Sequence, residues 1–362
     1  MGRKLAQMYR RYAEVDAAKI SPLYERLALA LSESDAALHA IETAPARKRH
    51  PALILAALHN LALTGQAPSL TAAYAAVATD AGLPLAASVD AAVVAAVEAL
   101  VGMTDAVVSV VAQRKVRGNA TGNHALLYPA IAEVARRVGA SSVGLVDVGS
   151  APGFNLNVDR AGISHGNGQS LGDPSSPVQV SASIVGDRPV PTQVMPEVVA
   201  RIGVDLEPID TTNADEARWL RACLPPDQPE RITRLEGELE LAATAPPLLV
   251  RGEAVEVLSD ALARVPADAL PVVITTWALS DLSLESRLRF LQRLDEAATE
   301  RPVAWVSVEG VGVAPAIPTF GDRHASGHSI IGLAVFGHST LRAEAVGRCW
   351  LRGQMLAWLG SD

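Results

Sequence analysis

The chain has 362 residues, 49% of them hydrophobic and 19% charged, and a formal net charge of −8 at pH 7. This length predicts two domains rather than one, and the composition is typical of a soluble globular protein with a large core. Two cysteines without C-x-x-C spacing, Cys223 and Cys349, exclude a disulfide framework and favour buried thiols in a reducing compartment.

The charges are divided unevenly along the chain. Residues 1–139 carry 14 Lys+Arg and 11 Asp+Glu, or +3, whereas residues 140–362 carry 17 and 28, or −11. The last lysine of the sequence is Lys115, so the acidic second part has none. Because phosphate contacts supply most of the affinity for nucleic acid, we expect no nucleic-acid partner.

The apolar stretches do not indicate a membrane partner. Residues 51–63 are interrupted by His59 and Asn60 and are too short to span a bilayer. The N-terminal residues are amphipathic and charged, which is unlike a signal peptide. The sequence therefore predicts a cytoplasmic protein.

The first part of the chain has the apolar spacing of helices. Positions three and four apart recur with no longer fixed period, so a solenoid is not expected. We expect residues 1–139 to form a helical bundle or cap whose last segment covers the cofactor edge. Its helices are expected at 3–18, 21–32, 34–44, 51–64, 69–80, 91–102, 104–116 and 124–138.

The rest of the chain is organised around residues 143–160. Residues 143–148 are mostly apolar and predict a buried parallel strand. Gly149-Ser150-Ala151-Pro152-Gly153 then permits a tight turn, and Asn155, Leu156 and Val158 suggest the first turns of a helix. A strand, a glycine turn and a helix N-terminus make a nucleotide-type site, unless the glycines serve packing only.

Strands and helices alternate after this turn, which predicts a doubly wound, mostly parallel sheet over residues 140–362. Residues 162–177 are expected to be a loop, and residues 192–245 a helical insertion. The expected strands are 178–185 as the second of the sheet, then 247–251, 271–276 and 303–308, with an antiparallel hairpin from 330–336 and 343–358. Asp147, Glu253, Trp277 and Glu309 fall at the carboxyl ends of four strands, where open α/β sheets bind ligands.

The turn has an acid two residues before its first glycine, and its glycines are four apart, unlike a dinucleotide G-x-G-x-x-G. This D-x-G-x-x-x-G pattern resembles the first motif of class I S-adenosylmethionine-dependent methyltransferases. The resemblance implies a Rossmann-like sheet with an antiparallel C-terminal hairpin and S-adenosylmethionine as cofactor. It assigns the cofactor to Asp147, Gly149, Ser150, Ala151, Gly153 and Asn155, with Glu253 near the adenine, Trp277 stacking on cofactor or substrate, and either Asp187 or Asp205 on the ribose.

Six segments together also resemble the family called domain of unknown function 2332: SPLY (21–24), NATGNHALLYPA (119–130), DVGSAPGFNLNVD (147–159), GVDLEPID (203–210), RGEA (251–254) and WVSVEG (305–310). The likeness covers nearly the whole chain and implies a helical cap on a methyltransferase-type sheet. The family name does not imply a particular reaction. Two elements depart from the family pattern. Its Thr-Asn-Glu appears here as Gly118-Asn119-Ala120, and a strand histidine appears as Thr275, which implies a different substrate or loss of activity.

Other chemistries fit less well. The turn also resembles that of ribose 2′-O RNA methyltransferases, but their Lys-Asp-Lys-Glu set cannot be assembled without lysines. The sequence has no D/N-P-P-Y/F element at the fourth strand, no P-loop lysine motif, and no G-x-S-x-G elbow between a predicted strand and a predicted helix. Asp322, His324 and His328 have a spacing compatible with a metal, but no helix is predicted there, so no metal is expected.

The sequence therefore predicts a small-molecule methyltransferase or a diverged member of that fold. Glu309 and His124 are the candidate bases, and Asn119 and Tyr128 the candidate substrate residues. The alternative for His124 and Tyr128 is that they are satisfied surface or interface residues. The alternatives are a non-catalytic sensor of the cofactor and a different nucleotide-dependent enzyme. The methyl acceptor and the oligomeric state are not indicated by the sequence.

Overall fold

The computed structural model describes residues 2–79, 85–118 and 121–360. By its contacts the chain divides into two compact units. The helical unit comprises Met1–Asn119 and Asn213–Glu236, and the sheet unit comprises Ala120–Thr212 and Gly237–Asp362. The expected substrate residue Asn119 lies outside the described residues.

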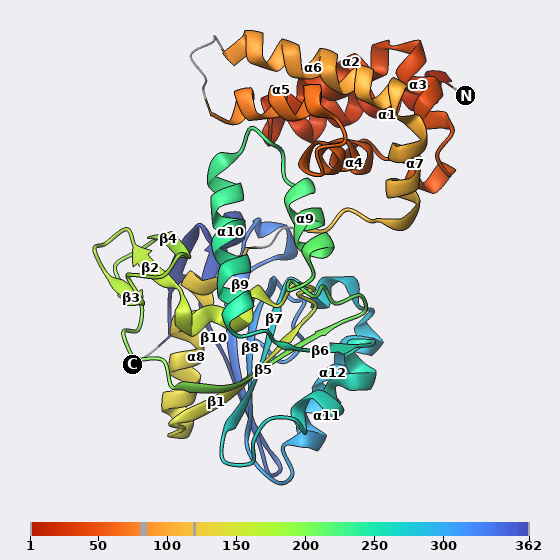
Figure 1. Cartoon of the computed structure of the whole chain (residues 1–362). Helices are drawn as coiled ribbons and strands as arrows, with labels where there is room; N and C mark the ends of the chain where they lie inside the picture. The colour runs from red at the N-terminus through yellow and green to blue at the C-terminus, as the bar shows by residue number, and fades with distance from the viewer. Residues whose placement is uncertain (1, 80–84, 119–120, 361–362) are drawn as a thin grey trace. The chain divides into compact units, whose positions relative to one another are not determined.

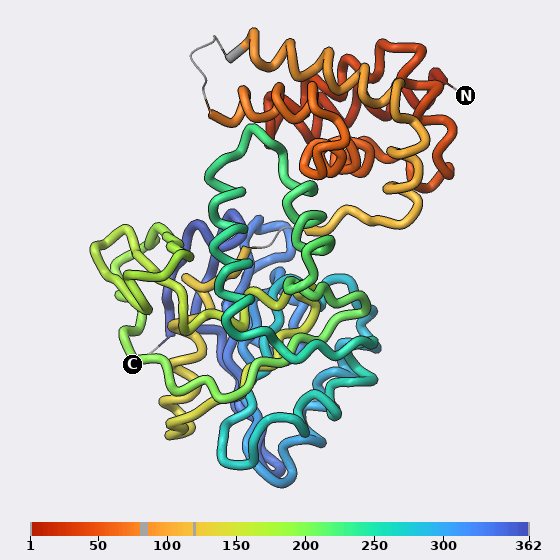
Figure 2. Tube along the Cα trace, viewed as in Figure 1, coloured from red at the N-terminus to blue at the C-terminus, as the bar shows by residue number. Residues whose placement is uncertain are grey.

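The helical unit contains most of the helices expected from the sequence, and their coils follow one another from red to orange along the trace (Figure 2). Ser21 begins the second helix by accepting a hydrogen bond from the Tyr24 amide, with proline at the first helical position. The helices are α1 (Gly2–Val15), α2 (Pro22–Glu33), α3 (Asp35–Glu42), α4 (Pro51–Leu63), α5 (Pro68–Ala78), α6 (Leu85–Gly102), α7 (Thr104–Gln113) and, from later in the chain, α9 (Ala214–Ala222).

Helix α9 joins this unit through Trp219. The indole is 1% exposed, lies in the same core as Leu27 and Leu55, and donates from Nε1 to the Lys115 carbonyl at 2.8 Å. Residues 213–236, which the sequence analysis placed in an insertion of the sheet domain, therefore pack with the N-terminal helices.

No single helix among the described residues has the length and apolar composition needed to cross a bilayer. Ala86–Gly102 and Thr104–Gln113 meet that test only when taken together, and the chain bends by 86° between them.

The sheet unit is built on one sheet, which has eleven strands within the described part of the chain. Helix α8 (His124–Val138) precedes it, α10 (Pro229–Thr244) enters it from residue 237, and α11 (Ala254–Leu262) and α12 (Leu284–Ala297) follow strands. The strands are β1 (Ser142–Val148), β2 (Gly162–His165), β3 (Ser170–Gly172), β4 (Gln179–Ile184), β5 (Glu197–Asp205), β6 (Leu248–Arg251), β7 (Leu270–Thr276), β8 (Val303–Gly310), β9 (Ser329–Gly337), β10 (Thr340–Trp350) and β11 (Met355–Trp358).

The sheet is of the α/β type, in the order β3-β2-β4-β11-β10-β9-β8-β7-β1-β5-β6. Strands β6, β5, β1, β7 and β8 run parallel, and β9, β10 and β11 follow with antiparallel pairing. Side chains alternate along the strands: Val272 and Ile274 pack with α8, whereas Val273 packs with α11 and α12. Figure 1 shows α8 on one side of the strands and α11 and α12 on the other.

Three local predictions were wrong. The strand beside β1 is β5, because β4 pairs with β2 and β11 in the other half of the sheet. The signal for β5 was present in EVVARIGVD, whose β-branched residues lie in the supposed insertion. Residues 162–177, expected as a loop, contain β2 and β3, whose glycines and serines hid their pairing.

The third correction concerns the segment after the glycine turn. Residues Phe154–Arg160 form a 3-10 helix that is broken at Asn157 (φ −96°, ψ 18°), not an α-helix. Two asparagines and an aspartate in seven residues compete for backbone hydrogen bonds and disfavour α-helix. The α-helix N-terminus expected at the bend is therefore replaced by a short 3-10 segment.

Candidate functional site

The candidate site lies at the carboxyl ends of β1, β5 and β7. β1 is central, with β5 on one side and β7 on the other, both parallel to it. The strand order therefore reverses at β1, and this switch point is where doubly wound sheets bind ligands.

The bend after β1 requires both of its glycines. Gly149 has φ +80° and Gly153 φ +66°, a left-handed conformation that costs other residues free energy. A Cβ on Gly149 would lie 2.6 Å from the Ala278 Cβ, so the chain itself makes the close approach on that side. This contact supports the packing explanation for Gly149. The bend nevertheless faces outward, because Gly149 is exposed and Ser150 and Ala151 are half-buried.

Asp147 is buried beneath this bend at 0% exposure. Its Oδ1 accepts a hydrogen bond from Asn155 Nδ2 at 3.2 Å, and the same amide donates to Thr276 Oγ1 at 3.2 Å. Oδ2 has no partner among the described residues. Burial raises the pKa of Asp147 to about 7 and the nearby charge of Asp205 also raises it, against the lowering effects of Asn155, Ser150 and His124.

A second buried polar pair, His124 with Glu238, lies beside this network. The side chains of both residues are 0% exposed, and His124 Nε2 lies 2.9 Å from Glu238 Oε1. Oε1 also accepts the Gly122 amide at 2.7 Å, and the Asn123 amide donates to Asn155 Oδ1 at 3.0 Å. A continuous chain of polar contacts thus links Glu238 with Asp147.

The hydrogen bonds and neighbours of the His124 ring determine which of its nitrogens has a partner. Because an ionised carboxylate only accepts, His124 Nε2 donates to Glu238, and Nδ1 has no hydrogen-bond partner among the described residues. A Cβ on Gly122 would lie 2.1 Å from His124 Nε2, so only glycine fits there. Sequence reasoning missed Glu238. Its signal was a position on the apolar side of α10, three residues after Leu235 and next to Leu239, both buried.

Two further acids lie at the same edge. Asp205 ends β5 and accepts the Glu207 amide on Oδ1 at 2.8 Å. Glu253 follows β6 and caps α11 by accepting the Val255 amide on Oε2 at 3.1 Å. Asp187 follows β4 in the other half of the sheet, so of the two acids left open for a ribose only Asp205 lies at this edge.

Glu309, a predicted base, supports the chain after β7. It is 1% exposed, and its Oε1 accepts the amides of Ala278 and Leu279 at 3.1 and 3.2 Å. Burial raises the pKa of Glu309 to about 7, against the lowering effect of these two hydrogen bonds. It borders a cavity of about 10 Å³ together with Ser307, and Glu309 Oε2 and Ser307 Oγ have no partner among the described residues. This volume suits one water molecule.

Trp277 follows β7 with φ +53°, and Leu351 and Arg352 have φ +49° and +51°. Each left-handed non-glycine residue costs about 1 to 2 kcal/mol. The Arg352 guanidinium carbon lies 5.4 Å from the centroid of the Trp277 ring, and Trp277 Nε1 donates to Ser329 Oγ at 2.8 Å. An exposed cation–π contact contributes about 0.5 to 1 kcal/mol, so it does not offset the strain of three residues.

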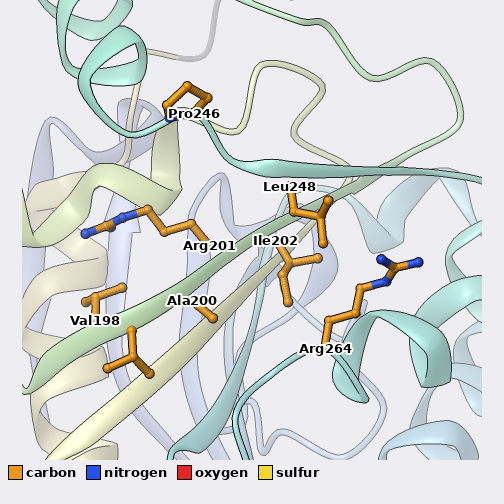
Figure 3. Close-up of a pocket in the computed structure, with 8 residues that line it drawn as sticks. Val198, Ala200, Arg201, Ile202, Pro246, Leu248 and Arg264 are labelled. Atoms are coloured by element: carbon orange, nitrogen blue, oxygen red, sulfur yellow. The ribbon is translucent and has the colours of Figure 1, made fainter.

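Tyr128 is not at this edge. Its hydroxyl accepts the Met195 amide at 3.2 Å, and it borders a cavity of about 530 Å³ together with Glu197, at the start of β5. A second cavity, of about 330 Å³, lies along β5 (Figure 3) and is bordered by Val198, Val199, Ala200, Arg201, Ile202, Pro246, Leu248 and Arg264. Neither cavity is lined by the acids at the carboxyl ends of the strands.

The loop after β8 holds the residues with metal-like spacing. Asp322 accepts two hydrogen bonds from the Arg348 guanidinium, at 2.7 and 3.0 Å, and its Oδ2 lies 2.8 Å from His328 Nε2. His324 packs on Gly312 instead. Within the described ranges, no group of three or more His, Cys, Asp or Glu side chains has the arrangement of a metal site.

The chain belongs to the family described as an uncharacterized protein conserved in bacteria, domain of unknown function 2332, whose model matches residues 6–358. A search of curated proteins returns no match to the sequence.

Proposed function

We propose that this member of the family is an S-adenosylmethionine-dependent methyltransferase acting on a small molecule, with the cofactor across the bend from Gly149 to Gly153. The observation that carries the proposal is that Asp147, Asp205 and Glu253 occupy the ends of three adjacent parallel strands beside that bend. S-adenosylmethionine is cationic at its sulfonium and amino groups and has no phosphate. Acids at this edge therefore attract it, whereas they would repel a pyrophosphate.

The residues present fit this cofactor. The buried Asp147 Oδ2, which has no partner among the described residues, suits the amino group, since a cationic donor there would satisfy the atom and keep the carboxylate ionised. Asp205 would accept from the ribose hydroxyls. Glu253 would accept from the adenine amino group with the oxygen that does not cap α11.

Methyl transfer is an in-line displacement, so much of its rate comes from holding the nucleophile about 3 to 3.5 Å from the methyl carbon. A base contributes when the nucleophile carries a proton. His124 suits this role better than Glu309, because Glu238 holds its ring and leaves Nδ1 as the acceptor, whereas Glu309 holds the backbone of residues 278 and 279. Glu238 would stabilise the imidazolium that forms.

Isothermal titration with S-adenosylmethionine and S-adenosylhomocysteine tests the proposal. We expect both to bind, and Asp205→Asn to weaken binding at least tenfold. Asp187→Asn is the matched control, because it removes an acid of the other half of the sheet. Its affinity for both compounds should equal that of the parent protein. If neither compound binds the parent protein, the proposal is refuted. Binding of both without turnover over a metabolite panel would favour the sensor instead.

A further inference from the structure

The contact between Trp277 and Arg352 lies outside the set of residues that the proposed function gives to the cofactor. Trp277 follows β7, and Arg352 lies in the turn between β10 and β11. Both residues have positive φ, as does the adjoining Leu351. Backbone strain of this kind persists at sites where the placement of a side chain serves function.

Two contacts place this pair beside the site. Ser329, which accepts the Trp277 indole hydrogen bond at 2.8 Å, pairs in register with Gly310 at the carboxyl end of β8. Gly353, next to Arg352, packs on Leu126 in the first turn of α8, the turn that begins at His124. The pair therefore lies at the same edge as the bend, on the opposite side of β1 from Asp205 and Glu253.

The charge of Arg352 is available for a ligand. The Arg352 side chain is exposed, and its guanidinium contacts the Trp277 ring. No ion pair joins it to an acid among the described residues. Arg348, on the same side of the sheet unit, shows the opposite arrangement: it stacks on Phe320 at 4.8 Å and is also paired with Asp322. A guanidinium that lies over an indole ring can still bind a carboxylate through N–H groups that do not face the ring.

We propose that Trp277 and Arg352 form the acceptor subsite, and that the methyl acceptor is a small acid whose carboxylate binds Arg352 while its body lies on Trp277. This inference rests on the proposed methyl transfer. The acids beyond β1 would hold the cationic cofactor, and the guanidinium on this side would hold the anionic acceptor. In the reaction the nucleophile forms a bond to the methyl carbon, the sulfonium sulfur keeps the pair of the broken bond, and the nucleophile's proton goes to His124 Nδ1.

The test uses the full chain, S-adenosylmethionine labelled in the methyl group, and a low-molecular-weight bacterial extract divided by anion exchange. We expect label to enter compounds of the retained, acidic fraction and not those that flow through. Treatment of the retained fraction with phosphatase before the reaction distinguishes carboxylates, which stay active, from phosphate esters. Label in the flow-through fraction, in neither fraction, or only in phosphatase-sensitive compounds overturns the inference.

Variants connect the acceptor with the residue. Arg352→Ala keeps a non-glycine residue in the left-handed conformation, and we expect it to raise KM for the acidic fraction at least tenfold with kcat changed less than threefold. The KM of Arg352→Lys for the acidic fraction should lie between those of the parent protein and Arg352→Ala. Arg342→Ala, an exposed arginine of β10, is the matched control and should match the parent. Equal KM values for Arg352→Ala and Arg342→Ala overturn the inference, whereas loss of cofactor binding by the parent protein refutes the proposed function itself.

Discussion

Replacement of Asp147 by asparagine should stabilise the sheet unit in a way that depends on pH. The pKa of this carboxyl is about 7 in the folded protein, mainly because of burial, against an ordinary value of 3.8. An acid with a raised folded pKa costs no stability below its unfolded pKa. The cost grows as the pH rises from about 4 to about 7 and is constant above, because the folded state must then hold a buried charge.

The size of the effect follows from the two pKa values. At about 1.4 kcal/mol per pKa unit, the wild-type carboxyl costs about 2 kcal/mol at pH 5 and about 4 kcal/mol at pH 8. The asparagine of the variant carries no charge and still offers an oxygen to Asn155. The free energy of unfolding of Asp147→Asn relative to the wild type should therefore increase by about 2 kcal/mol between these two pH values.

Hydrogen exchange of the β1 amides at pH 5 and pH 8 measures this difference within the sheet unit, after correction for intrinsic exchange rates. The helical unit provides the internal control, and its exchange should be the same in both proteins. If the two proteins differ in the free energy of exchange of the β1 amides by the same amount at pH 5 and at pH 8, the reasoning is refuted. That result would mean that Asp147 is ionised and well paired in the folded state. Saturating S-adenosylmethionine should protect the wild type at pH 8 and the variant much less.

Three further substitutions test the local geometry. Gly122→Ala places a methyl group against the buried His124 imidazole, so it should lower the free energy of unfolding by more than about 2 kcal/mol and weaken cofactor binding. Gly118→Ala, which has open space around it, is the control and should change the free energy of unfolding little in chemical denaturation. Gly149→Ala adds a clash to the cost of a positive φ and should destabilise more than Gly65→Ala, which has a similar φ of +71° in open space and should cost about 1 kcal/mol; equal Tm losses would contradict this. Glu309→Gln removes a buried acid whose pKa is raised to about 7, so its stability relative to the parent should increase with pH by up to about 3 kcal/mol between pH 4 and 8, and a decrease would show that the carboxylate is needed ionised.

The sequence predicted the elements whose signal is local. The helices of the first part and the strands β1, β6, β7, β8 and β9 were found, because apolar periodicity and glycine breaks mark them. The segment 343–358, expected as one arm of a hairpin, is divided between β10 and β11. The neighbours of β1 were not, because strand order depends on contacts far apart in sequence. The strand β5 was therefore overlooked and β4 took its place.

The candidate site shows the same division. Asp147, the bend, Glu253 and Glu309 follow directly from the motif and the ends of the predicted strands. Asp205 was only one of two candidates, because the strand that it ends was not predicted. Glu238 could not be found that way, because it reaches His124 from a helix more than a hundred residues later. The strain at Trp277 was equally hidden, since it arises from the turns after β7 and β10 and not from residue type.

The outer edge of β5 has a consequence for solubility. β6 pairs only with residues 202–205, which leaves the first part of β5 without a strand on that side among the described residues. Such an edge invites pairing with another molecule, but Pro246 and Pro247 precede β6, and an extra residue interrupts the register where Val143 meets Val198 and Gly144 meets Ala200. The prolines have no N–H to donate to a neighbouring strand, and the extra residue bends β5 locally. We expect both features to disfavour pairing with a strand of another molecule, and therefore aggregation through this edge.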